Sequence, residues 1–133
     1  MRTLIVEDDL VSRKILENVL INYGSCDTAI NGLEAIAVFC RALDETRPYD
    51  LICMDIMMPE LSGQDALRQI RQIEKQMGVP AGDAVKVFMT TALSETKEVI
   101  DALYKGGASA YFVKPIHIDH FIKELKSAEL IQE

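Results

Sequence analysis

The chain has 133 residues, with 14 lysines and arginines against 21 aspartates and glutamates, and so carries a formal charge of −7. This length suits one domain with one core, and an apolar fraction of 49% excludes wholesale disorder. The acidic balance argues against nucleic-acid binding, which depends largely on clustered lysine and arginine. The apolar runs are far shorter than the roughly 20 residues of a membrane-spanning helix. We therefore expect a cytoplasmic protein.

Five short apolar runs predict the strands of a sheet. Four of them, at residues 4–6, 51–54, 85–89 and 110–113, have no polar alternation, which suits strands covered on both faces, as in a parallel sheet. The weaker run at residues 26–30 predicts an edge strand.

Between and after these runs, apolar residues recur every three or four positions, which predicts five helices with one apolar face each. In the first helix that face consists of Val11, Ile15, Leu16, Val19 and Leu20. The polar stretch at residues 74–84 is interpreted as a loop or a frayed helix end. Strands that alternate with helices indicate an α/β fold of five βα units, with right-handed crossovers and helices on both faces of the sheet.

Cysteine and histidine are too few to favour a zinc site. Cys26, Cys40 and Cys53 form an odd set with no C-x-x-C spacing, so a disulfide framework is not indicated. We predict that all three are buried, reduced thiols that pack as small hydrophobic side chains. His117 and His120 are interpreted as surface residues and not as a phosphotransfer site.

Charged and hydroxyl side chains follow the predicted strands, at the edge where an open α/β sheet binds its ligands. They are Glu7, Asp8 and Asp9 after the first strand, Asp55 after the third, Thr90 and Thr91 after the fourth, and Lys114 after the fifth. Neighbouring carboxylates repel one another, so we infer that a cation binds there. Oxygen ligands without histidine or cysteine favour Mg²⁺, which commonly joins carboxylates to a phosphate. The lysine and a threonine hydroxyl would complete a cradle for phosphoryl oxygens.

The segments V-E-D-D, D-I-M-M-P-E-L-S-G, T-A and K-P together resemble the receiver domain of the two-component response-regulator family. Asp55 lies 47 residues after Asp8, Thr91 lies 36 residues after Asp55, and Lys114 lies 23 residues after Thr91, as in that family's pattern. The likeness covers nearly the whole chain, so we interpret residues 1–133 as one receiver domain. It implies a flavodoxin-like (βα)5 fold, a doubly wound parallel sheet of five strands in the order 2-1-3-4-5.

The resemblance implies a chemical role for each acid and for the lysine. Asp55 would be the phosphoacceptor, taking a phosphoryl group from a phosphohistidine on a sensor histidine kinase or a histidine phosphotransfer protein. Asp8, Asp55 and the backbone carbonyl of Met57 would bind Mg²⁺ directly, and Glu7 would act through a bound water. Lys114 would pair with a phosphoryl oxygen.

The resemblance also implies how the site switches and how long the phosphoryl group lasts. The Thr91 hydroxyl and the backbone N–H of Ala92 would bind further phosphoryl oxygens. Tyr111 occupies the family's aromatic switch position and would turn inward when Thr91 moves toward the phosphoryl group. Met57 and Leu93 occupy the positions that set the rate of dephosphorylation. Neither side chain can hydrogen-bond an attacking water, so we expect slow self-dephosphorylation.

The expected function is that of a phosphorylation-activated signalling switch, which catalyses its own Mg²⁺-dependent phosphoryl transfer but is not a dedicated enzyme. The resemblance implies that its output would be a downstream protein or a homodimer, bound through the fourth helix, the fifth strand and the fifth helix. Candidate contact residues on that surface are Asp101, Lys105, Tyr111, His120 and Lys123. The Lys114–Pro115 peptide bond is expected to be cis.

Three other functions compete with this interpretation. A receiver-like scaffold would bind partners without phosphorylation and could retain the same residues. A flavodoxin-type cofactor site would need a Ser/Thr/Gly-rich loop after the first strand, where this chain has three acids. A phosphatase of the haloacid dehalogenase type would need a D-x-D motif, which the run Asp55-Ile56-Met57 lacks.

Overall fold

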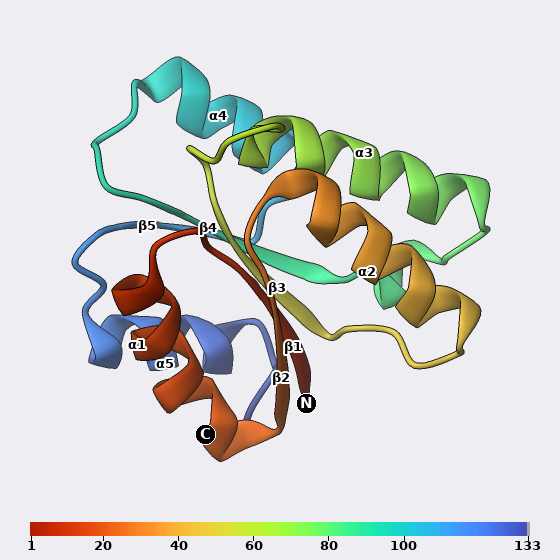
Figure 1. Cartoon of the computed structure of the whole chain (residues 1–133), viewed down its shortest axis with the longest axis horizontal. Helices are drawn as coiled ribbons and strands as arrows, with labels where there is room; N and C mark the ends of the chain where they lie inside the picture. The colour runs from red at the N-terminus through yellow and green to blue at the C-terminus, as the bar shows by residue number, and fades with distance from the viewer. Residues whose placement is uncertain (133) are drawn as a thin grey trace.

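The computed structural model describes residues 1–132 and arranges them around one parallel sheet of five strands (Figure 1). The strands are β1 (Arg2–Val6), β2 (Ser25–Ala29), β3 (Leu51–Asp55), β4 (Lys86–Thr91) and β5 (Ala110–Val113). Their order is β2-β1-β3-β4-β5, and every neighbouring pair is parallel. The flavodoxin-like order 2-1-3-4-5 is therefore confirmed.

Five α-helices and two 3₁₀ turns connect and follow the strands. They are α1 (Leu10–Leu20), α2 (Gly32–Asp44), α3 (Gly63–Gln76), α4 (Lys97–Lys105) and α5 (Ile118–Ser127), with the 3₁₀ turns η1 (Ile21–Tyr23) and η2 (Ala81–Asp83). α1 and α5 cover one face of the sheet, and α2, α3 and α4 cover the other (Figure 1). Within residues 1–132, no helix has the length and apolar character needed to span a membrane.

Four of the five helices begin at a side chain that caps them. Asp9, Asn31, Ser62 and Thr96 each accept a hydrogen bond from the backbone N–H three residues later. Such caps satisfy an N–H group that has no partner in the first turn of a helix. The capped ends of α1 to α4 follow the carboxyl ends of the strands, so they also fix the loops that carry the polar side chains.

The core consists of two layers, one on each face of the sheet. Phe39 of α2 and Ile70 of α3 pack in one layer, and Leu20 of α1 and Phe121 of α5 pack in the other. Each of these side chains is at most 1% exposed. β3 lies in the middle of the sheet and is buried along its whole length. The prediction of strands covered on both faces is confirmed for this strand.

Several of the predicted boundaries and burial patterns differ from the structure. β2 begins and ends one residue earlier than predicted. Asp55, Thr90 and Thr91 lie inside β3 and β4 instead of following them, because the ladder continues through the pairs Asp55–Thr90 and Thr91–Val113. Of the three cysteines only Cys53 is buried, and the other two are partly exposed.

The predicted apolar face of α1 is only partly correct. Leu16 and Leu20 are buried, but Val11 is 66% exposed and Ile15 is 45% exposed. Val11 and Ile15 lie about 140° round the helix from Leu16 and Leu20, so one pair faces the sheet while the other faces solvent. The chain thus presents large apolar side chains on the outer side of α1.

The stretch interpreted as a loop or a frayed helix end, residues 74–84, begins with the last residues of α3. α3 continues to Gln76, and Glu74 is only 5% exposed. Its carboxylate pairs with Arg71 at 2.6 Å and accepts the backbone N–H of Val85 at 2.8 Å. Arg71 also donates to the carbonyls of Val85 and Gly107, both at 2.8 Å. These bonds tie α3 to the segments that lead into β4 and β5, which a charged sequence pattern alone does not indicate.

We predict that Arg71→Met lowers the free energy of unfolding by about 3 kcal/mol, because it leaves the buried Glu74 carboxylate without its cation. Arg68→Met is the matched control, since Arg68 forms an i,i+3 pair with Asp65 on the exposed side of the same helix. It should change the stability by less than about 1 kcal/mol. Urea unfolding at neutral pH measures both, and equal losses for the two variants would contradict the prediction.

Candidate functional site

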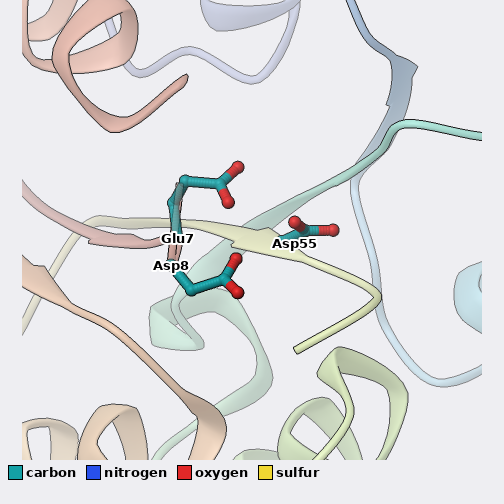
Figure 2. A group of neighbouring side chains, drawn as sticks. All are labelled: Glu7, Asp8 and Asp55. Carbon is teal, nitrogen blue, oxygen red and sulfur yellow. The ribbon is translucent and has the colours of Figure 1, made fainter. Parts of the chain in front are cut away.

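Three carboxylates meet at the carboxyl ends of β1 and β3. Oxygen atoms of Glu7, Asp8 and Asp55 all lie within 4.8 Å of one another. β1 and β3 are neighbours, and Val6 pairs with Met54, so the residues that come next reach the same edge of the sheet. Figure 2 shows Glu7 and Asp8 extending toward the side on which Asp55 lies. The structure thus brings the predicted acids together.

The three acids differ in their exposure to solvent. Glu7 is 1% exposed and Asp55 is 6% exposed, whereas Asp8 lies at the surface. Burial raises the pKa of Glu7 to about 6, an effect that the hydrogen bond from Lys114 partly offsets and the nearby charge of Asp55 reinforces. Burial therefore makes the charged form of the Glu7 carboxylate less favourable than it is in water.

Lys114 is the cation that the protein itself supplies to this cluster. It follows β5, and its ammonium group reaches back to bond the Glu7 carboxylate and, at 3.1 Å, Asp55 Oδ2. Burial lowers the pKa of Lys114, but the hydrogen bonds to Glu7 and Asp55 outweigh it, so the pKa of Lys114 is raised and the group stays charged. The Lys114–Pro115 peptide bond is cis, as expected from the sequence.

The backbone around Asp55 is closely packed. The N–H of Met57 donates to Asp55 Oδ1 at 3.1 Å, and the N–H of Gly63 donates to the carbonyl of Ile56 at 2.8 Å. A Cβ atom at Gly63 would lie 2.2 Å from the carbonyl oxygen of Asp55, so only glycine fits where α3 begins. The start of α3 therefore rests directly against the backbone of Asp55.

Thr91 and Tyr111 both hold the loop between β4 and α4. The fully buried Thr91 accepts the backbone N–H of Leu93 through Oγ1 at 3.3 Å. The partly exposed Tyr111 accepts the N–H of Glu95 through its hydroxyl at 3.0 Å. Ala92 and Leu93 themselves are exposed. The two predicted switch residues thus contact one short segment, and sequence reasoning did not foresee the contact with Glu95.

The donor set fits a small divalent cation. The residues offer carboxylate oxygens and no sulfur or imidazole nitrogen, which suits Mg²⁺ better than zinc. Three carboxylates against one ammonium leave two negative charges, which a divalent ion would balance. Glu7, Asp8 and Asp55 would supply the side-chain oxygens, and the Met57 carbonyl lies two residues beyond Asp55 in the same loop.

Sequence reasoning missed one basic residue beside the acids. Arg13 of α1 donates from Nη1 to the backbone carbonyl of Glu7 at 2.9 Å. The available signal was its position four residues after Asp9, one turn into the helix that follows the acids. Nothing in that spacing indicates a backbone carbonyl as the partner.

Sequence reasoning also missed how many large apolar side chains are exposed in the segments that follow the strands. We call this set the apolar rim. Its members are 49–66% exposed and are Leu10, Val11, Ile30, Leu33, Met57 and Leu93. All of them follow the carboxyl ends of β1, β2, β3 or β4, the same edge of the sheet as the acids. Single exposed apolar side chains are ordinary on a protein surface, whereas a contiguous patch of them is typical of a surface that contacts another protein.

Comparisons with a family model and with known proteins point to the same family. The family model of the response regulator receiver domain matches residues 3–126. The chain is 32% identical over 130 residues to the chemotaxis protein CheY of Listeria monocytogenes, which covers 96% of this chain and 98% of that protein. Both proteins are thus similar over almost their whole lengths.

Solved structures of receiver domains are similar as well. One match is the Saccharomyces cerevisiae co-crystal structure of the histidine phosphotransfer protein Ypd1 and the receiver domain of Ssk1. It is 29% identical in sequence, with a TM-score of 0.82, and the match covers 99% of this chain and 90% of the matched chain. The receiver domain of the Arabidopsis thaliana histidine kinase CKI1, complexed with Mg²⁺ and BeF₃⁻, shares the fold at 24% identity, with a TM-score of 0.80 and coverage of 98% and 90%.

The segment matched by the family model contains the acids, Thr91 and Lys114 as well as most of the sheet and the helices. The fold, the strand order and the clustered acids agree with this match. The chain therefore belongs to the response regulator receiver domain family of two-component signalling.

Proposed function

We propose that Asp55 accepts a phosphoryl group from a phosphohistidine, in the presence of Mg²⁺, and that phosphorylation changes the surface that a partner binds. The observation that carries this proposal is the cluster of Glu7, Asp8 and Asp55 bridged by Lys114. Like charges this close repel one another. A bound cation would offset that repulsion and would allow an anionic ligand to bind between the cation and Lys114. A phosphoryl group held between metal and lysine is such a ligand.

The residues of the chain would act mainly by positioning and by neutralising charge. A carboxylate oxygen of Asp55 forms the new bond to phosphorus, and the bond from phosphorus to the histidine nitrogen breaks. Bound Mg²⁺ would neutralise charge on the phosphoryl oxygens. Lys114 would turn its ammonium group from Asp55 Oδ2 to a phosphoryl oxygen, and the N–H of Ala92 would bind another.

The switch would act through the loop that Thr91 and Tyr111 both hold. The Thr91 hydroxyl would leave the N–H of Leu93 and bond a phosphoryl oxygen. Tyr111 would then lose the loop geometry that presents the N–H of Glu95, and turn inward. Phosphorylation at the end of β3 would in this way reach β5 and α4, where the output surface is expected.

Two different surfaces would serve the phosphodonor and the output. The apolar rim follows the same edge of the sheet as the acids, so it suits a kinase domain or a histidine phosphotransfer protein that must bring its phosphohistidine to Asp55. The receiver domain of Ssk1, a similar protein, was crystallised with such a phosphotransfer protein. The output would use the surface formed by α4, β5 and α5, with a downstream protein or a second copy of the chain. Its candidate residues are Asp101, Lys105, Tyr111, His120 and Lys123.

We predict that incubation with Mg²⁺ and acetyl phosphate adds the mass of one phosphoryl group to the protein, measured on the intact chain. The addition should disappear in Asp55→Ala and with EDTA. Asp83→Ala is the matched control, because Asp83 is an exposed acid in η2 before β4, and it should label like the wild type. No labelling of the wild type, by acetyl phosphate or by a phosphorylated kinase, would favour the phosphorylation-independent scaffold.

We predict that replacing Met57 and Leu93 by glutamine speeds the loss of the phosphoryl group, by up to about a hundredfold, because a polar group there could orient the attacking water. Both side chains are about 60% exposed at the edge of the site and offer such a water no strong hydrogen bond. Decay of the labelled protein is followed by intact mass. Met77→Gln, an exposed methionine at the end of α3, is the control and should decay like the wild type. An unchanged rate in the double variant would contradict the prediction.

We predict that the stability of the metal-free protein falls as the pH rises from about 4.5 to 6. Burial raises the pKa of Glu7 from 4.5 to about 6 in the folded state, so the folded protein holds this proton more tightly than the unfolded chain. This shift in the pKa of Glu7 corresponds to a stabilisation of the folded state by about 2 kcal/mol. The stabilisation is fully present below pH 4.5 and is lost above pH 6.

Glu7→Gln should remove this dependence and gain up to about 2 kcal/mol over the wild type between pH 4.5 and 7. Urea unfolding in EDTA at several pH values measures the difference between the two proteins. Glu98→Gln, at an exposed position in α4, controls for the loss of one carboxylate at the surface. A difference between Glu7→Gln and wild type that stays constant with pH would contradict the prediction.

A further inference from the structure

Arg13 is tied to the strand end that carries the acids. Its Nη1 donates to the carbonyl of Glu7 at 2.9 Å, and its backbone N–H donates to the carbonyl of Asp9 at 3.0 Å. Glu7 lies one residue beyond β1, where its N–H still bonds the carbonyl of Ala29. Arg13 therefore satisfies a carbonyl that lies past the end of the β1 strand.

The segment from Glu7 to Asp9 is fixed by several bonds, and Arg13 supplies the one on the Glu7 carbonyl. The Asp9 side chain accepts the N–H of Ser12, and the N–H of Asp9 donates to the Glu7 carboxylate at 3.1 Å. Asp8 lies between these anchored neighbours and is exposed. Its carboxylate position relative to Asp55 therefore depends on how well the backbone on either side is held.

Arg13 can affect metal binding in two ways, through its positive charge and through its hydrogen bond to the Glu7 carbonyl. A guanidinium beside a cation site opposes metal binding by Coulomb repulsion. Its hydrogen bond to the Glu7 carbonyl acts in the opposite direction if that bond orients the Glu7 and Asp8 carboxylates toward the metal. The two effects predict changes of opposite sign when Arg13 is replaced, so one experiment separates them.

We propose that Arg13 is a positioning residue for the divalent cation: its bond to the Glu7 carbonyl holds Glu7 and Asp8 in the arrangement that binds Mg²⁺. The proposal rests on the metal site of the proposed function. Groups that hydrogen-bond to metal-binding residues and orient them commonly raise the affinity for the metal by a factor of 10 to 100. We expect Arg13→Gln to weaken Mg²⁺ binding by about tenfold, at the lower end of that range, because only one bond is lost.

The experiment is a calorimetric titration of the metal-free full chain with Mg²⁺, compared among wild type, Arg13→Gln, Arg13→Lys and Lys14→Gln. Lys14 is the matched control, since it is the next residue of α1, is 63% exposed and pairs with Glu17 on the surface at 3.2 Å. Lys14→Gln removes the same charge and should leave the affinity unchanged or slightly tighter. Arg13→Lys keeps a donor and the charge, and should restore most of the affinity.

Urea unfolding in EDTA accompanies each titration and shows that the variants are folded when they are titrated. Arg13 is partly exposed and glutamine is a good helix former, so α1 tolerates the change. The proposal would be overturned if Arg13→Gln bound Mg²⁺ as tightly as the wild type or more tightly. It would also be overturned if Lys14→Gln lost as much Mg²⁺ affinity as Arg13→Gln. Failure of the proposed function looks different, because wild type itself would then bind no Mg²⁺ or would not be labelled at Asp55.

Discussion

The bridge from Lys114 to Glu7 and Asp55 is the interaction on which the rest of the site depends. Without this cation, three carboxylates at the ends of adjacent strands would repel one another, and solvent does little to screen the two buried ones, Glu7 and Asp55. Lys114 makes the cluster compatible with folding, yet it leaves negative charge for a divalent ion. Lys114 follows β5, Glu7 follows β1 and Asp55 ends β3, so the bridge exists only when these strands are joined through β4 in one sheet.

The two ends of the sheet serve different purposes. At the carboxyl edge, the strand ends and the segments that follow them carry the acids, Thr91 and the apolar rim. Below them, Arg71 and Glu74 anchor α3 to the segments that lead into β4 and β5. The bonds of Arg71 and Glu74 at one end and the helix caps at the other thus hold both ends of the sheet in place.

Much of the fold and of the site can be predicted because parallel strands bring their carboxyl ends to one edge, so that acids, threonine and lysine far apart in the chain converge there. Other features leave no such trace. Glu74 belongs to a polar stretch and yet is buried against Arg71. Val11 and Ile15 fit an apolar stripe and yet face solvent. The partner of Arg13 is a backbone carbonyl, which no pattern of side chains records.

The close approach of Gly63 to the carbonyl of Asp55 has a consequence for how this protein can change over generations. Side chains of the apolar rim such as Ile30 and Leu33 are exposed, so their replacement costs the fold little. Position 63 has no such freedom, since any larger residue would push the start of α3 away from the backbone of Asp55. Substitutions can therefore accumulate on the exposed rim, while the close backbone contact between Gly63 and Asp55 stays closed to mutation.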